Sequence, residues 1–325
     1  MLMVPESTLS DLMLRLPIQQ RLERGVSRSR SLWLMSRAWG GLARVERSLS
    51  SRVPVLCVGG STLGGSGRTP LSIACARSLA RTCRVVVVGH GYGARPPAEP
   101  CFVDPTDDVQ RVGDEALECA VALAPHAVRV VVARDRQRAL DAAAPHADVI
   151  ILDGPLQLTP HRARLSLLAV HATMPWGSAA CPPLGDLRAP RAALERVSDR
   201  VVTVGPHGDV TWRSYGVRLD AKLVSWAAIR GRFPRMGLAT GIARPERVEA
   251  LLQEHGVVPQ RNVRVANHAP LEVENDASVD LWLITGKDAH RTKPSTHAPV
   301  AIIDYHLDLP PFLEELLTSR FSVRF

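Results

Sequence analysis

The chain has 325 residues, 46% of them hydrophobic, and a formal net charge of +8. This length and composition exclude a disordered protein and leave room for one large domain or two of ordinary size. The positive charge favours an anionic partner: nucleic acid, an acidic membrane surface or a phosphorylated substrate. Only 4% of the residues are aromatic and the sequence contains no nucleic-acid-binding motif, so nucleic acid is the partner that we do not expect.

Six scattered cysteines form no CxxC pair, so the sequence indicates neither a disulfide framework nor a zinc site. This cysteine usage fits a reducing cytoplasm. No uncharged apolar run reaches the roughly 18 residues of a transmembrane helix, and the first residues lack the basic-then-apolar order of a secretory signal. We therefore expect a soluble or peripheral protein.

The first segment, residues 1–48, mixes apolar residues and arginines in a pattern that predicts one or two amphipathic helices. Two interpretations stay open: a helix that packs on the rest of the domain, or one that also touches an anionic bilayer. Trp33 and Trp39 suit a membrane interface. Five arginines would engage lipid head groups there: Arg21, Arg24, Arg28, Arg30 and Arg37.

Short runs rich in valine and isoleucine follow, separated by helical stretches such as Pro70–Arg81 and Glu115–Leu123. Such runs are typical of strands buried on both faces, so residues 49–205 are predicted to form a nucleotide-binding core, a mostly parallel sheet flanked by helices. The predicted strands are Val53–Val58, Val85–Val88, Val128–Val132, Val149–Leu152, Leu165–Val170 and Val201–Val204.

Residues 206–232 alternate between apolar and polar side chains, which predicts a connecting hairpin with its turn at Gly208 and Asp209. A smaller C-terminal α/β domain is expected over residues 233–325. Its predicted strands and helices are Met236–Thr240, Pro245–His255, a strand near Val263, Leu281–Thr285, Val300–Ile303 and Pro311–Ser319.

The first predicted strand runs into the glycine-rich segment VGGSTLGGSGRTP, Val58–Pro70. A strand, a glycine-rich turn, a basic residue, a threonine and a helix are the layout of a P-loop, whose backbone N–H groups surround nucleotide phosphates. The predicted nucleotide-binding residues are Thr62, Leu63, Gly64, Gly65, Ser66, Gly67, Arg68 and Thr69. Thr62 replaces the first glycine of the usual motif and Arg68 its lysine, so an ordinary glycine-rich turn is the alternative.

A magnesium site is expected beside this loop. The Thr69 hydroxyl would bind the ion together with an acid at the end of a neighbouring strand, and Asp153 directly follows the apolar run Val149–Leu152.

The P-loop segment resembles that of the tetraacyldisaccharide 4'-kinases, VGN-x-T-x-GG-T-GKTP, which also begins with threonine. Other segments are similar to that family in the same order along the chain. They are VVVVGHGYGAR (Val85–Arg95) to SRGYG, VGDEA (Val112–Ala116) to VGDEP, IILDGPLQL (Ile150–Leu158) to DDGFQH, GIARPERVEA (Gly241–Ala250) to GIGNPERF, Asn267-His268 to Asp-His, and TGKDA (Thr285–Ala289) to TEKDA.

The resemblance implies a P-loop NTPase-like kinase that uses ATP and Mg²⁺. Its acceptor would be the 4'-hydroxyl of tetraacyldisaccharide 1-phosphate, an acylated glucosamine disaccharide lipid, and its product lipid IVA in lipid A biosynthesis. The resemblance also implies that Asp114 is the catalytic base, supported by His268, that Arg68 acts on the phosphates, and that Glu115 joins Thr69 and Asp153 at the metal. Because the acceptor lies in the cytoplasmic leaflet of the inner membrane, a cytoplasmic protein peripheral on that anionic membrane is expected.

Several positions depart from the family pattern besides Arg68. With the segments aligned through Gln157, Asp153 takes the first aspartate of DDGFQH, Gly154 replaces the second and Leu158 replaces the histidine; Asn267 replaces the aspartate of Asp-His. Loss of a metal-linked acid lowers a rate by orders of magnitude when nothing replaces it. The sequence therefore leaves open a diverged member with weak or no activity, a P-loop ATPase switch of the chromosome-partitioning type, and a kinase with another acceptor. It fixes neither the acyl pattern of the acceptor nor the oligomeric state.

Overall fold

The computed structural model of the chain describes residues 30–321 apart from residues 44, 90–94, 96–97, 243 and 266–268. Its larger sheet has seven strands within this described part. Their order across the sheet is β4 (Cys101–Phe102), β5 (Arg129–Val132), β3 (Val85–Val88), β6 (Val149–Gly154), β2 (Val55–Gly60), β8 (Leu165–His171) and β9 (Arg200–Val204). Every neighbouring pair is parallel except β4 and β5. The predicted parallel sheet is confirmed.

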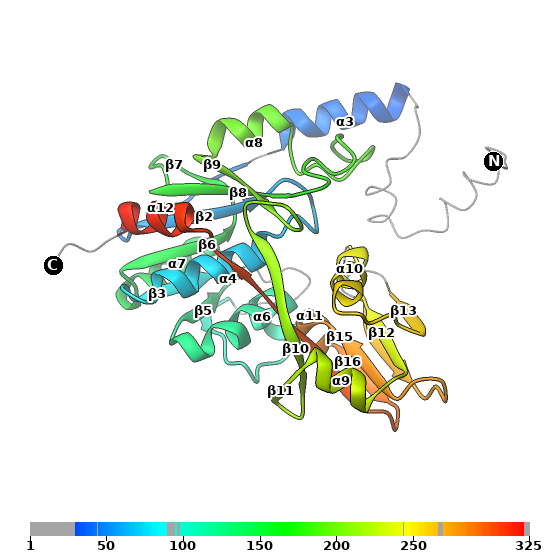
Figure 1. Cartoon of the computed structure of the whole chain (residues 1–325). Helices are drawn as coiled ribbons and strands as arrows, with labels where there is room; N and C mark the ends of the chain where they lie inside the picture. The colour runs from blue at the N-terminus through cyan, green and yellow to red at the C-terminus, as the bar shows by residue number, and fades with distance from the viewer. Residues whose placement is uncertain are drawn as a thin grey trace.

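Helices cover both faces of this sheet (Figure 1). On one face lie α4 (Arg68–Leu79), α6 (Asp114–Leu123) and α12 (Pro311–Phe321), and on the other lies α7 (Arg136–Ala143). The remaining elements of this part are α3 (Arg30–Leu42), α5 (Val109–Val112), α8 (Arg191–Val197), two short 3₁₀ helices (Ala124–His126 and Ala144–His146), and the parallel pair β1 (Glu46–Ser48) and β7 (Gln157–Thr159). We call the seven-stranded sheet with these elements the first lobe.

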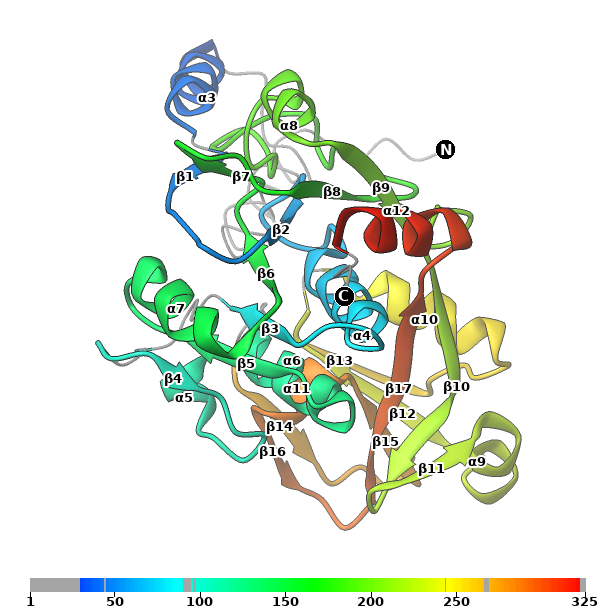
Figure 2. The same cartoon turned by 90° about the vertical axis from the view of Figure 1, so that its left-hand side faces the viewer.

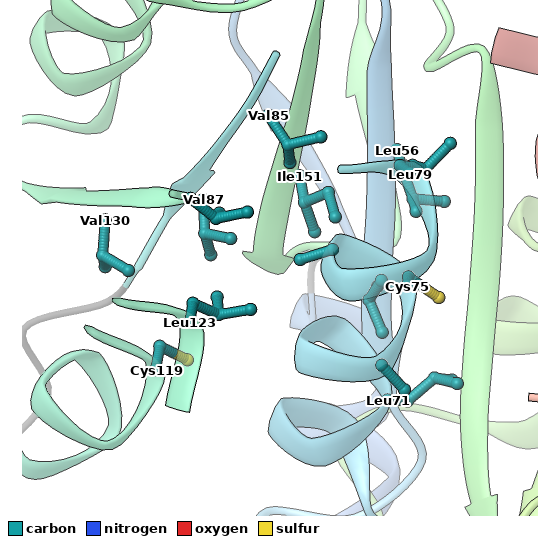
Figure 3. Packing of buried hydrophobic residues seen from close by; sticks show 14 of the residues in the cluster. Leu56, Leu71, Cys75, Leu79, Val85, Val87, Cys119, Leu123, Val130 and Ile151 are labelled. Atoms are coloured by element: carbon teal, nitrogen blue, oxygen red, sulfur yellow. The ribbon is translucent and has the colours of Figure 1, made fainter. Parts of the chain in front are cut away.

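The core of the first lobe follows from the two-residue period of its strands. Val85 and Val87 point to the face covered by α4 and α6, whereas Val86 and Val88 point to the face covered by α7. Figure 3 shows Val85 and Val87 facing the α4 side, together with Leu71, Cys75 and Leu79 of that helix. Both faces are buried, which is why the strands contain unbroken apolar runs.

The second lobe is built on a six-stranded sheet within the described residues. Its order is β11 (Lys222–Ser225), β10 (Thr211–Leu219), β17 (Val300–Asp308), β15 (Leu281–Ile284), β12 (Met236–Thr240) and β13 (Arg261–Arg264). The lobe also contains α9 (Trp226–Arg232), α10 (Glu246–Glu254), α11 (Gly286–Ala289) and the parallel pair β14 (Leu271–Glu274) and β16 (Thr292–Ser295). Each strand and helix expected between residues 236 and 319 is present within a few residues of its predicted bounds.

Two long antiparallel strands, β10 and β17, connect the lobes (Figures 1 and 2). The predicted hairpin exists as β10 and β11, but its turn is at Asp220 and Ala221, both with positive φ, and not at Gly208 and Asp209. The latter two residues lie in the short turn between β9 and β10. The pattern-based placement was wrong because alternation continues on both sides of that turn, whereas β10 pairs with β11 and β17.

The chain returns to the first lobe after β17. Leu313, Leu317 and Phe321 of α12 are buried in the same cluster as Leu71 and Leu79 of α4. The expected boundaries at residues 48, 205 and 232 stay a prediction, and α12 packs on the first sheet although it lies in the predicted C-terminal segment. None of the helices in the described part is long and apolar enough to span a membrane.

Candidate active site

The glycine-rich turn lies between β2 and α4, at the carboxyl end of the central part of the sheet. Gly65 and Gly67 have φ values of 72° and 86°, which L side chains rarely adopt, and a Cβ on Gly67 would lie 2.6 Å from a side-chain carbon of Val204. Glycine is therefore required at both positions. Because Gly67 directly precedes α4, the unpaired N–H groups of that helix begin at the loop, which makes this end of the sheet suited to an anion.

Arg68 connects the loop to two acids. Its Nη2 lies 2.5 Å from Glu115 Oε2 and its Nε lies 3.0 Å from Asp153 Oδ1. Burial lowers the pKa of Arg68, but the carboxylates of Asp153 and Glu115 more than offset this, so that the pKa is raised. Arg68 is therefore a permanent cation at the start of α4.

Asp153 lies at the end of β6, which pairs directly with β2. It is 2% exposed, and the hydroxyl groups of Thr69 and Ser72 donate to its two oxygens at 3.2 and 2.9 Å. The predicted pairing of Thr69 with an acid from a neighbouring strand is thus seen in the structure.

The Gly-Asp-Glu segment begins α6 beside the loop. Asp114 and Glu115 are the first two residues of that helix, Asp114 is 5% exposed, and the Glu115–Arg68 ion pair joins the helix to the loop. Lys287 of α11 approaches the same acids from the second lobe, with its Nζ 3.7 Å from Asp114 Oδ2 and 3.5 Å from Glu115 Oε1. The folded chain therefore brings residues 68, 114, 115, 153 and 287 to one place.

Comparisons with known proteins agree with this geometry. A family model described as tetraacyldisaccharide-1-P 4'-kinase matches residues 28–322. The chain belongs to this family. The tetraacyldisaccharide 4'-kinase of Chromobacterium violaceum is 32% identical to it over 84% of this chain and 85% of that protein, and the one from Acidithiobacillus ferrooxidans is 31% identical over 94% and 98%. A crystal structure of LpxK from Aquifex aeolicus in complex with ATP shares the fold, with a TM-score of 0.68 and 20% identity over 90% of this chain and 98% of that one.

Membership of the tetraacyldisaccharide-1-P 4'-kinase family gives meaning to the TGKDA segment, to which the sequence assigned no role. Thr285 caps α11 by accepting from the N–H of Asp288, and Asp288 is fully buried. The Asp288 carboxylate accepts from the hydroxyls of Thr240 and Thr285, each at 2.7 Å, from the N–H of Gly241, and from Arg291. This buried hub fixes the start of α11, so that Lys287 next to it is held toward Asp114 and Glu115.

Two further arginines surround the loop and were also missed from the sequence. Arg136 donates to the carbonyl oxygen of Asp153 at 3.4 Å, and the buried Nε of Arg188 has no hydrogen-bond partner within the described ranges. Burial, and then the charge of Arg68, lower the pKa of each to about 10. Both still carry a positive charge at neutral pH. The surplus of cations over acids favours a multiply charged anion at this end of the sheet.

Gly154 explains why one expected acid is missing. Its φ is 128°, and a Cβ at this position would lie 2.8 Å from Nη2 of Arg136. A cation therefore occupies the space that a side chain at residue 154 would need. Leu158, which replaces the family's histidine, is buried against the α7 face of the sheet.

The predicted loop residues before Arg68 have distinct structural roles. The Thr62 hydroxyl donates to the carbonyl of Gly64 at 2.6 Å, within the loop, and Ser66 is buried. The N–H of Leu63 donates to the carbonyl of Asp186 at 2.8 Å. That N–H is consequently engaged by protein, whereas Gly64 to Thr69 form the turn into α4.

Other predicted positions lie outside the described residues. These are the possible catalytic partner His268 with Asn267, the His90–Gly93 part of the GYG segment, and the N-terminal arginines Arg21, Arg24 and Arg28.

Proposed function

We propose that this chain transfers the γ-phosphate of ATP to the 4'-hydroxyl of tetraacyldisaccharide 1-phosphate, giving lipid IVA. The observation that carries this proposal is the meeting of the P-loop Arg68 and Thr69 with Asp153 and with the Asp114–Glu115 start of α6, in a member of the tetraacyldisaccharide-1-P 4'-kinase family. Phosphoryl transfer needs phosphate-binding cations, a metal bridge and a base for the attacking hydroxyl. The cluster provides candidates for each.

The residues fit a magnesium ion that comes with the nucleotide. Among the described residues no three histidine, cysteine or acidic side chains form a metal-binding cluster. Magnesium usually needs only one or two carboxylates in addition to phosphate oxygens and water. Asp153, Thr69 and Glu115 provide oxygen ligands of this kind, and the bound ion would neutralise charge on the transferred phosphate.

Each protein group then has a separate task. The N–H groups from Gly64 to Thr69 surround the phosphates, while Arg68 exchanges part of its pairing with the two acids for phosphate oxygens. Asp114 accepts the proton of the acceptor hydroxyl, and Lys287 holds its carboxylate from the second lobe. The support of Asp114 by His268 stays a prediction.

An assay with radiolabelled ATP, Mg²⁺ and tetraacyldisaccharide 1-phosphate tests the proposal. Wild-type protein is expected to label the lipid, and Asp114→Asn, which keeps the size of the side chain, is expected to do so about 10²- to 10⁴-fold more slowly. ATP binding without label on the lipid would instead favour a diverged, inactive member. Hydrolysis that needs a protein or DNA partner and no lipid would favour the partitioning-type switch.

We also propose that α3 seats the enzyme on the cytoplasmic face of the anionic inner membrane. Five large apolar side chains of this helix are 48–80% exposed: Trp33, Leu34, Met35, Trp39 and Leu42. Arg30 and Arg37 belong to the same helix, and Arg37 lies over the ring of Trp33. Exposed leucine and tryptophan beside arginine are typical of helices that lie in a membrane interface.

The membrane proposal is tested with vesicles that contain anionic lipid. A Leu34→Asp/Leu42→Asp variant should sediment less with them than wild type and should show a raised KM for the lipid but an unchanged KM for ATP. Leu223→Asp serves as the control because Leu223 is equally exposed but lies in the second lobe. Unchanged sedimentation of the α3 variant would refute the seating.

A further inference from the structure

Arg244 belongs to the second lobe but its side chain lies on the P-loop. It is located between β12 and α10, in the segment where the family resemblance has GIGNPERF and this chain has GIARPERV, so that arginine stands in place of asparagine. Its Cδ and Nε would lie 2.8 Å from a Cβ on Gly65, whose missing side chain provides the necessary space. Arg244 is only 9% exposed.

Asp186 of the first lobe holds this arginine. Its Oδ2 lies 3.1 Å from Arg244 Nη2, and the Asp186 side chain is 2% exposed. Its other oxygen, Oδ1, accepts from the N–H and hydroxyl of Ser178 at 2.9 and 3.0 Å. The carbonyl of Asp186 accepts from the N–H of Leu63, so the same residue contacts the P-loop through its backbone and Arg244 through its side chain.

One donor of Arg244 is left over. Nη1 contacts the sulfur of Met174 at 3.2 Å and Nη2 contacts Asp186, but the buried Nε–H has no hydrogen-bond partner in the part of the chain that the structure describes. A buried donor without an acceptor is unfavourable and calls for an explanation. This donor lies against Gly65, and the ligand expected at Gly65 is rich in acceptor oxygens.

A second buried donor lies close to Arg244. Nδ1 of His171 accepts from the N–H groups of Thr173 and Met174, so the proton of the neutral ring is on Nε2, which has no partner among the described residues. His171 ends β8, the strand next to β2. Burial, and then the charges of Arg247 and Arg244, lower its pKa to about 4, so the ring is neutral at physiological pH.

We propose that Arg244 is a nucleotide-binding residue supplied by the second lobe, which Asp186 holds over Gly65 so that it contacts the phosphate chain of ATP bound in the P-loop. The contact would give the unpaired Nε–H an acceptor and add positive charge where the phosphates lie. It would also make nucleotide binding favour the arrangement in which the two lobes meet, because the arginine and the P-loop belong to different lobes. This inference rests on the proposed use of ATP.

Binding of MgATP, measured by calorimetry without lipid, tests the inference. Arg244→Asn should weaken binding about tenfold or more, because a charge-assisted contact to phosphate is lost. Asp186→Asn, which leaves the arginine without its anchor, should weaken binding less. The Arg244→Asn/Asp186→Asn double variant leaves no buried unpaired charge, so it should fold like wild type and still bind MgATP as weakly as Arg244→Asn.

Arg235→Asn is the matched control, because it removes the exposed Arg235–Asp280 ion pair of the same lobe. Its affinity for MgATP should equal that of wild type. A folded double variant with wild-type affinity would overturn the inference alone. Failure of the wild type to bind MgATP would remove the proposed function and the inference together, whereas binding without lipid phosphorylation would remove only the proposed acceptor.

Discussion

The two lobes build the site in different ways. The first lobe provides main-chain features, namely a glycine turn, the carboxyl end of β6 and the first turn of α6, and these carry Arg68, Asp153 and Asp114. The second lobe provides single long side chains, Lys287 and Arg244, which cross to the first lobe from the ends of its own strands. The comparison indicates that chemistry belongs to the rigid sheet, while the second lobe adds charges that depend on how the lobes meet.

The largest effect is expected where the first lobe concentrates its charges. Arg68→Met would leave Asp153 and Glu115 without their shared cation, so we expect a loss of about 3–5 kcal/mol in the free energy of unfolding and about a thousandfold in kcat/KM. Denaturant unfolding and the lipid kinase assay measure the two quantities. Arg68→Lys keeps the charge and should retain most of the stability. If Arg68→Met proved as active as wild type, the loop would not act through this residue.

Lys287→Met examines the second lobe in the same way. We expect kcat to fall about 10²-fold because Asp114 loses its holding cation, while KM for ATP changes little. Steady-state kinetics with each substrate varied in turn would show this split. Lys222→Met is the control, since Lys222 is an exposed lysine of β11. An effect confined to KM for ATP would assign Lys287 to nucleotide binding.

Restoring the acid that DDGFQH leads one to expect should fail. Gly154→Asp places a side chain at a φ of 128° and against the guanidinium of Arg136, which should cost about 1–3 kcal/mol of stability without any gain in kcat. Thermal unfolding and the kinase assay check both points. Gly231→Asp, at a helical glycine with open space around it, should be nearly neutral. A gain in activity from Gly154→Asp would mean that the first lobe does lack an acid.

The smallest expected effect concerns Glu118, where the lobes touch. Burial raises the pKa of Glu118 to about 7, partly offset by Lys287, and the hydroxyl of Tyr305 lies 3.5 Å from its Oε1. A raised pKa means that the folded state holds this proton between about pH 4.5 and 7, so its stabilising contribution is lost as the pH rises through 7. Relative to Glu118→Gln, wild type should lose on the order of 2 kcal/mol between pH 5 and 8 in denaturant titrations. Parallel pH curves for the two proteins would contradict the raised pKa.

The sequence predicts the first lobe better than the second because local signals define it. Valine runs indicated its strands, and the pattern from Val58 to Pro70 indicated the loop, before any contact was known. Lys287, Arg244 and Asp186 could not be found in this way, because each acts on a residue more than a hundred positions away or belongs to no motif of its own. The turn at Asp220 and Ala221 was missed for a similar reason, since neither residue is a glycine.

The order of elements along the chain also bears on how the protein is made. The first lobe is interrupted after β9, and its core is completed only by α12, which follows the whole of the second lobe. During translation the apolar side of α4 must therefore wait, uncovered, until the ribosome has released nearly every residue. Truncation near residue 310 would remove a small helix at the end of the chain, yet the damage would fall on the nucleotide-binding half.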